Sequence, residues 1–149
     1  MLAAPVMKRQ NSPNTGTGSV RILVADDHEV MRLGIRNLLE AKRNWQVCAE
    51  AGTGQEAIDK ARLCNPDVVI MDITMPVMNG LDAAQFLMQS QPQIPIVLFS
   101  LHLSPELIGT FAQSGIRGAV CKSDAARDLV DTVETVLAGK TFFRVNSAV

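Results

Sequence analysis

The stretch "VVIMDITMP", residues 68–76, decides the fold, because a run of four apolar residues leads there to an acidic residue, Asp72, and then to a Met-Pro turn. A continuous apolar run of this length is typical of a strand that is buried on both faces of a parallel sheet. A carboxylate at the end of such a strand needs a compensating group or a shifted pKa. Asp72 is therefore the first candidate for a functional residue.

Strand-like and helix-like segments alternate on both sides of this stretch. The spacing of apolar residues predicts strands at 20–25, 45–51, 67–71, 94–100 and 118–121, and helices at 28–41, 55–64, 81–90, 105–114 and 126–139. Strands that alternate with helices in this way form right-handed crossovers, so we expect one parallel sheet with helices on both faces. The fold class is a doubly wound, three-layer α/β sandwich. The apolar and polar residues of segment 45–51 alternate, which is typical of a sheet edge.

Five polar residues follow the ends of the predicted strands: Asp26, Asp27, Asp72, Ser100 and Lys122. In a doubly wound sheet, functional groups gather at the carboxyl ends of the strands, so we expect these five to converge. Each alone also has a structural interpretation. The paired aspartates can cap the following helix, the serine can be a loop hydroxyl and the lysine a solvated charge. Their combination favours a functional site.

Three carboxylates, a hydroxyl and an ammonium are the groups that phosphoryl transfer to a carboxylate requires. A hard divalent cation, Mg²⁺ or Mn²⁺, would relieve the repulsion between the acids and neutralise charge in the transition state. Asp72 would be the nucleophile, since a carboxylate can form an acyl phosphate. Lys122 would supply positive charge to the phosphoryl oxygens, and Ser100 would supply a hydroxyl donor.

Three motifs, "VADDHEVMRLGI", "MDITMPVMNG" and "FSLH", lie within a segment from about residue 20 to residue 139 that resembles the receiver domain of two-component response regulators. The segment looks most like receivers of the class with a helix-turn-helix output domain. The resemblance implies a flavodoxin-like (βα)5 fold with strand order 2-1-3-4-5. It also implies that the phosphoryl group comes from a histidine kinase or a histidine phosphotransfer protein.

The resemblance assigns a role to each acidic residue. Asp27 would ligate magnesium, and Asp26 would hold the ion through water. Asp72 would accept the phosphoryl group and also ligate the ion, and the backbone carbonyl of Thr74 would complete the protein ligands. Such a domain is a phosphoacceptor and not an enzyme in the usual sense.

The sequence departs from the family pattern near two further site residues. Ser100 and Lys122 match the family's switch hydroxyl and lysine, but Ala119 stands where receivers usually have Tyr or Phe. Leu101 is larger than the small residue that many receivers have there, which predicts slower access of water to the phosphate. Ser123 replaces a common proline. These departures leave open an alternative, a receiver-like interaction module that works without phosphorylation.

The chain ends set the expected domain limits. We expect residues 1–18 to form a disordered leader, residues 19–140 the receiver domain and residues 141–149 a short C-terminal tail. An appended DNA-binding module would need about 50 residues or more. We therefore expect output through a downstream protein partner, with a phosphorylation-dependent homodimer as a further expectation.

The composition agrees with a globular domain. Of the 149 residues, 47% are apolar and 19% are charged, and the formal net charge is -1. The absence of a basic excess gives no indication of DNA binding, and no apolar run reaches the length of a membrane helix. The three cysteines include no CxxC pair, which indicates a reducing compartment and argues against a disulfide or zinc framework. We expect a cytoplasmic protein.

Two other kinds of site match parts of the sequence less well. The motif "AGTGQEA" has the G-x-G-x-x-A spacing of a dinucleotide-binding turn, with Asp72 twenty residues beyond Gly52. It is disfavoured because its strand is predicted to be an edge and because it leaves the other strand-end residues without a role. A haloacid-dehalogenase-like phosphatase would need a second acid where this chain has Thr74. The only histidines, His28 and His102, lack a partner at metal-ligand spacing.

Overall fold

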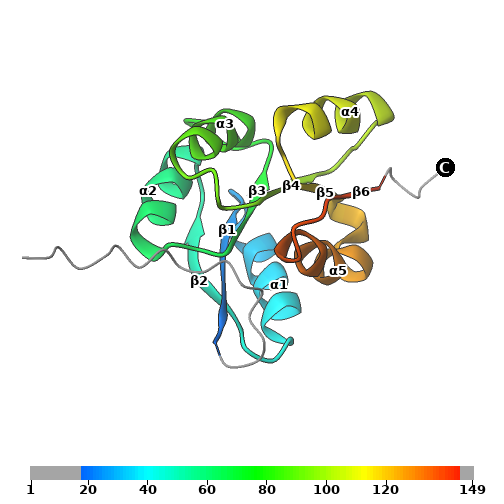
Figure 1. The fold of residues 1–149 in the computed structure, drawn as a ribbon. Helices are drawn as coiled ribbons and strands as arrows, with labels where there is room; N and C mark the ends of the chain where they lie inside the picture. Colours follow the sequence, from blue (N-terminus) through cyan, green and yellow to red (C-terminus); the bar gives the residue numbers. More distant parts are fainter. Residues whose placement is uncertain (1–17, 145–149) are drawn as a thin grey trace, which may run out of the picture.

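The computed structural model describes residues 18–144, which form one parallel sheet with helices on both faces (Figure 1). Its strands are β1 (Val20–Ala25), β2 (Trp45–Ala51), β3 (Val68–Asp72), β4 (Ile96–Ser100), β5 (Gly118–Cys121) and β6 (Phe142–Phe143). Their order is β2-β1-β3-β4-β5-β6, and every neighbouring pair is parallel. The predicted flavodoxin-like fold with order 2-1-3-4-5 is confirmed, and a short sixth strand extends it.

The helices are α1 (Glu29–Glu40), α2 (Gly54–Cys64), α3 (Gly80–Ser90), α4 (Pro105–Ser114) and α5 (Ala125–Leu137), with a 3-10 turn η1 (Lys122–Asp124) before the last. Side-chain oxygens of Thr53, Asn79 and Ser104 accept backbone N–H groups and so begin α2, α3 and α4. Helices α1 and α5 cover one face of the sheet, and α2, α3 and α4 cover the other (Figure 1). Within residues 18–144, no helix has the length and apolar character needed to cross a membrane.

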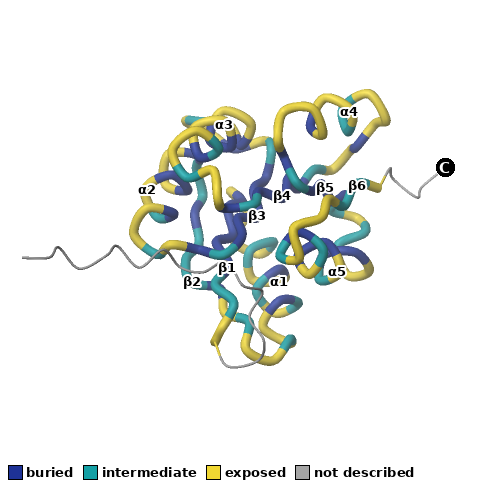
Figure 2. Tube along the Cα trace, in the orientation of Figure 1, coloured by how far each residue is buried: buried dark blue, intermediate teal, exposed yellow. Residues whose placement is uncertain are grey.

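Strand β3 is buried along its whole length, as the apolar run predicted (Figure 2). Val68 and Ile70 pack in the layer of α1 and α5, whereas Val69 and Met71 pack in the layer of α2, α3 and α4. Since both faces are covered, β3 has little freedom to move. The strand therefore delivers Asp72 to a fixed position at its carboxyl end.

Strand β2 lies at a sheet edge, as expected, but its predicted alternation is interrupted. Its pairing with β1 shifts after Val47, so that Ala49 takes the next position and Cys48 is an extra, bulged residue. Val47 packs in the α1–α5 layer, whereas Ala51 packs in the α2–α3–α4 layer. Because of the bulge, one alternating set of β2 side chains faces the α1–α5 layer before Cys48 and the α2–α3–α4 layer after it.

Strand β6 falls in the range that the sequence predicted to be a tail. Its residues Phe142 and Phe143 pair with Gly118 and Ala119 of β5. A strand of two residues has no periodic pattern that a sequence can reveal. Of the predicted leader, residues 1–17 lie outside the described residues, as do residues 145–149 of the predicted tail.

Two glycines allow the loops after β2 and β3 to pack closely. A Cβ atom on Gly54 would lie 2.4 Å from the carbonyl oxygen of Met78, and one on Gly80 would lie 1.9 Å from that of Asp72. The N–H of Gly54 donates to the Met78 oxygen at 2.8 Å. Close packing of this turn against its neighbour therefore accounts for Gly54, the second glycine of the spacing that resembles a dinucleotide-binding turn.

Candidate functional site

The carboxyl ends of β1, β3 and β5 bring acidic residues and a lysine together. One oxygen each of Asp26, Asp27 and Asp72, together with a ring nitrogen of His28, lie within 4.8 Å of one another. The Lys122 Nζ atom is 2.9 Å from Asp26 Oδ2 and 3.1 Å from Asp72 Oδ2. Residues at the ends of three separate strands therefore form one acidic cluster, with the Lys122 ammonium beside it.

Asp72 lies at the centre of this cluster and is almost fully buried, with 3% of its surface exposed. Its Oδ1 atom accepts the N–H of Thr74 at 3.2 Å, and its Oδ2 atom faces Lys122. Burial raises the pKa of Asp72, and the nearby charge of Asp26 raises it further. These effects outweigh the opposing contributions of Lys122 and the Thr74 amide.

Lys122 follows β5 directly and begins η1. Burial disfavours its charge, but hydrogen bonds and charge interactions with Asp26 and Asp72 outweigh burial and raise the pKa of Lys122. Its ammonium also lies 5.8 Å from the centroid of the Phe99 ring. Lys122 is thus held as a cation between two buried carboxylates.

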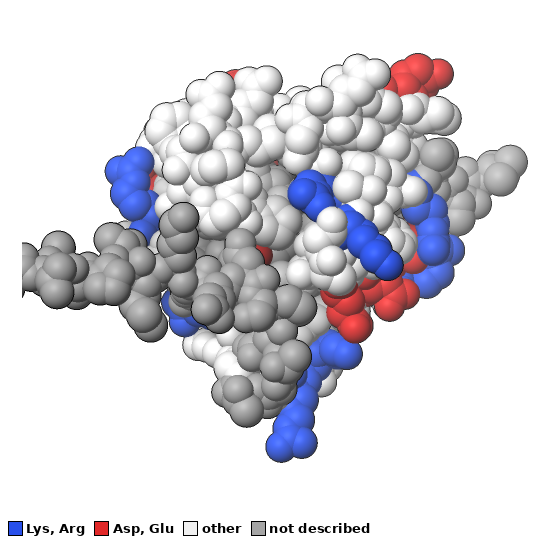
Figure 3. Space-filling view, in the orientation of Figure 1, with Lys and Arg blue, Asp and Glu red and all other residues white. Residues whose placement is uncertain are grey.

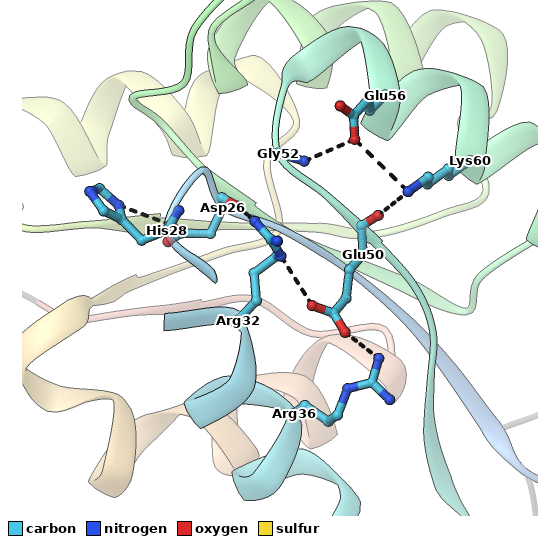
Figure 4. A network of polar contacts seen from close by, with 8 residues as sticks. All are labelled: Asp26, His28, Arg32, Arg36, Glu50, Gly52, Glu56 and Lys60. Carbon is cyan, nitrogen blue, oxygen red and sulfur yellow. Dashed lines mark hydrogen bonds and ion pairs between the residues drawn. The ribbon is translucent and has the colours of Figure 1, made fainter. Parts of the chain in front are cut away.

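A polar network fixes the turn that carries the paired acids (Figure 4). The Oδ1 atom of Asp26 accepts the backbone N–H of His28 at 2.8 Å, and its carbonyl oxygen accepts Arg32 Nη1 at 2.6 Å. Arg32 Nε also donates to Glu50 Oε1 at 3.0 Å, and Arg36 pairs with the same carboxylate. Burial tends to raise the pKa of Glu50, but the two arginines outweigh it and lower that pKa. Glu50 therefore remains charged and holds α1 against β2.

Ser100 and Thr74 contribute less directly to the acidic cluster. Ser100 follows Phe99, the residue that pairs with Asp72, but its hydroxyl donates to the His102 carbonyl at 3.0 Å. It also accepts the His102 N–H at 3.3 Å. Thr74 is exposed and contributes its amide to Asp72. The structure thus brings four of the five strand-end residues together and places the Ser100 hydroxyl in hydrogen bonds with its own loop.

His28 belongs to the cluster, although its sequence spacing did not indicate this. Its Nδ1 atom is 3.0 Å from Asp27 Oδ1 and 3.3 Å from Asp26 Oδ1, and 71% of its side chain is exposed. The signal in the sequence was its position directly after the acid pair. Arg32 and Glu50 were also missed, because their roles depend on contacts between α1 and β2 that no local motif contains.

The donor set fits a hard divalent cation. Among the described residues of the cluster, three carboxylates face one ammonium, so the balance of charge is negative. Oxygen ligands of this kind suit Mg²⁺ and Mn²⁺. Burial and the charge of Asp26 raise the pKa of Asp72, and a divalent cation at the cluster would oppose both effects. The Asp27 side chain is 29% exposed, which leaves the cluster open to solvent on that side.

A doubly wound α/β sandwich with acids and a lysine at the carboxyl edge of its sheet is the architecture of the receiver domains, which are phosphoacceptor signalling modules. The family model described as "Response regulator receiver domain" matches residues 22–134. The chain belongs to this family.

Individual relatives agree with this membership. Response regulator GacA of Pseudomonas viridiflava is 34% identical over 123 residues, which are 83% of this chain and 58% of the relative. Transcriptional regulatory protein LnrK of Bacillus subtilis (strain 168) is 33% identical over 120 residues, 80% of this chain and 54% of the relative. The chain therefore spans little more than half the length of these two relatives.

A solved structure with the same fold is that of a two-component response regulator of the LuxR family from Aurantimonas sp. SI85-9A1. It superposes with a TM-score of 0.79 at 33% identity and covers 84% of this chain and 89% of its own. The receiver domain of the putative response regulator NarL from Mycobacterium tuberculosis gives a TM-score of 0.77 at 27% identity, covering 83% and 100%.

Proposed function

We propose that this domain accepts a phosphoryl group on Asp72 from a histidine kinase or a histidine phosphotransfer protein, with Mg²⁺ or Mn²⁺ bound at the acidic cluster. The observation that carries the proposal is the position of Asp72, buried at the end of β3 and in contact with Lys122. Two further acids beside a buried aspartate make its charge less favourable, so a purely structural role does not explain the arrangement.

The transfer uses a carboxylate oxygen of Asp72 as the nucleophile. This oxygen forms a bond to phosphorus while the bond from phosphorus to the donor's imidazole nitrogen breaks, and the electron pair of that bond stays on the nitrogen. Lys122 holds positive charge beside the reacting oxygen. A bound divalent cation supplies charge neutralisation for the phosphoryl oxygens. We assign the ion to Asp27, to Asp26 through water, to Asp72 and to the backbone carbonyl of Thr74.

Ser100 provides the expected response to phosphorylation. Its hydroxyl now donates to the His102 carbonyl, and we infer that it exchanges this acceptor for a phosphoryl oxygen. Such an exchange would favour one conformation of the loop after β4, because the phosphoryl group interacts differently with the two conformations. The change would reach α4, which begins at Pro105.

We assign the output to protein contact on the surface near α4. Helices α3 and α4 have one charged residue each, Asp82 and Glu106, and Figure 3 shows a largely uncharged surface in this region. Leu81 and Phe86 of α3 add apolar exposed area there. Such a surface suits a downstream protein partner or a second copy of this chain in a phosphorylation-dependent dimer.

A second candidate function is that of a receiver-like module that binds its partner without phosphorylation. Ala119 favours it, since it stands where the family pattern has the aromatic ring that reports on the switch. The two candidates differ in their response to a phosphoryl analogue. Only the phosphoacceptor should respond to beryllofluoride in a metal-dependent way.

NMR amide spectra of the whole chain, recorded with beryllofluoride and with or without Mg²⁺, test the proposal. We expect Mg²⁺-dependent shifts in the loops after β1, β3 and β4 for the wild type and for Asp131→Asn, an exposed aspartate of α5. Asp72→Asn should abolish these shifts. A wild-type spectrum that does not change on adding beryllofluoride and Mg²⁺ would reject the phosphoacceptor and favour the second candidate.

A further inference from the structure

Two cysteines that are far apart in the sequence face each other between β2 and α2. The Sγ atoms of Cys48 and Cys64 are 2.9 Å apart, and both residues are partly exposed. The third cysteine, Cys121, is buried in β5 with its sulfur 3.2 Å from the Leu101 carbonyl oxygen. The spacing of the cysteines in the sequence gave no indication of a pair, but the structure brings two of them into contact.

The backbone holds both members of the pair in place. Cys48 is the bulged residue of β2, and a bulge changes the direction in which a side chain projects. Cys64 is the last residue of α2, and the helix ends there because Asn65 adopts a left-handed conformation with φ 45°. Arg21 Nε donates to the Cys64 carbonyl at 3.0 Å and fixes this helix end to β1. The contact between the sulfurs therefore depends on regular elements and not on a loose loop.

The environment of Cys48 disfavours its thiolate form. Burial raises the pKa of the Cys48 thiol to about 12, and the hydrogen bond and charge interaction with Cys64 contribute to this rise. The Cys48 thiol therefore keeps its proton at neutral pH and is a poor nucleophile. Cys64 is then the sulfur that we assign to the first reaction with an oxidant.

We propose that Cys48 and Cys64 are a reversible oxidation site, which a peroxide converts into an intramolecular disulfide between β2 and α2. The thiolate of Cys64 attacks a peroxide oxygen, the O–O bond breaks and a sulfenic acid forms with release of hydroxide. The Cys48 sulfur then attacks the sulfenic sulfur, forms the S–S bond and displaces a second hydroxide. With the two thiol protons, two thiols and one hydrogen peroxide give one disulfide and two waters. A dithiol reductant reverses the oxidation by exchange.

The site is separate from the acidic cluster, because neither cysteine belongs to it. The disulfide would join two residues that are 16 positions apart, which restricts the unfolded chain and makes the oxidised protein more resistant to urea. It would also tie the edge strand β2 to the helix that packs on it. Transient disulfides of this kind occur in reducing compartments as redox-sensing groups.

Treatment of the full chain with graded hydrogen peroxide, followed by intact-mass measurement and peptide mapping, tests the inference. We expect the loss of two hydrogen atoms, a cross-link that joins Cys48 to Cys64, and a higher urea midpoint that dithiothreitol reverses. Cys121→Ser is the matched control and should behave like the wild type. Cys48→Ser and Cys64→Ser should each lose the intramolecular product.

Alkylation in urea, after the folded wild type has been oxidised, counts its free thiols, including the buried Cys121, without any variant, so the test holds even if a serine variant fails to fold. One alkylated thiol after oxidation, at Cys121, agrees with the proposal. Three alkylated thiols at peroxide concentrations that oxidise a small dithiol would overturn it. A disulfide that involves Cys121 or links two chains would also overturn it.

Discussion

At the residue scale, the environment of Asp72 determines how its charge affects stability. Burial and Asp26 raise the pKa of Asp72, so the folded state binds its proton more tightly than the unfolded chain does. The ionised carboxylate therefore costs stability at neutral pH, and this cost disappears as the pH falls below the ordinary aspartate pKa of about 4. The ionised Asp72 carboxylate therefore does not serve to stabilise the fold.

We predict that Asp72→Asn is modestly more stable than the wild type at pH 7 without metal and that the gain shrinks toward pH 4. Urea unfolding at both pH values measures it, with Asp131→Asn as the control. Mg²⁺ should stabilise the wild type more than Asp72→Asn, because the variant lacks one carboxylate ligand. A less stable Asp72→Asn protein at pH 7 would contradict the raised pKa.

Val77, in the loop after β3, is strained. It is β-branched and 89% exposed, yet its φ of 68° lies in the left-handed region that such residues avoid. Asparagine tolerates this conformation, so Val77→Asn should raise the free energy of unfolding by about 1 kcal/mol.

Urea unfolding measures this increase in stability. Val30→Asn, at an exposed and helical position of α1, should give none, and equal effects of the two changes would show that Val77 is not strained.

The site residues differ in how well the sequence predicts them. The four residues of the cluster that the sequence predicted lie at the end of a strand or within two residues after it: Asp26, Asp27, Asp72 and Lys122. Parallel strands bring their carboxyl ends to one edge, so local patterns are sufficient to predict these residues. His28 joins the cluster through a turn geometry that its spacing does not reveal.

At the element scale, the contact between α1 and β2 positions the paired acids. Arg32 binds both the Asp26 carbonyl and Glu50, whereas Arg36 pairs with Glu50. Arg32→Ala should therefore weaken Mn²⁺ binding about tenfold, as loss of a supporting contact around metal ligands does. Arg36→Ala is the matched control and should change it little. Calorimetric titration measures both, and equal affinities for Mn²⁺ would remove the positioning role of Arg32.

Strand β6 offers a substitute for the aromatic ring that the family pattern has at Ala119. Phe143 pairs with Ala119 and packs against the α2–α3–α4 layer. We predict that Phe143→Ala loses most of the beryllofluoride-induced NMR shifts in β5 and α4 and keeps those around Asp72. Phe142→Ala, which alters the neighbouring position, should keep both sets. An unchanged response of Phe143→Ala would show that this ring has no part in the switch.

At the scale of the whole molecule, the layered α/β architecture follows from patterns that repeat along the chain. Buried runs such as that of β3 and the apolar stripes of the helices predict the sheet and its two covered faces. The bulge at Cys48 and the pairing of β6 were not predictable, because each depends on a neighbour distant in sequence. The strand order itself came from the family resemblance and not from these patterns.

The parallel sheet brings residues that are distant in the sequence to the carboxyl edge of its strands. Asp26, Asp72 and Lys122 lie at the ends of three adjacent or nearby strands and contact one another only because the sheet is parallel. The central claim is that this arrangement makes Asp72 the phosphoryl acceptor. Its chemistry leaves a covalent product whose position can be mapped.

The most direct test is to incubate the whole chain with acetyl phosphate and Mg²⁺, reduce the product with borohydride and map the modified residue by mass spectrometry. Borohydride converts an aspartyl phosphate into homoserine. We predict homoserine at position 72 in the wild type and in Asp131→Asn. Homoserine at another aspartate, or none in a sample where a known receiver is modified alongside, would contradict the proposed function.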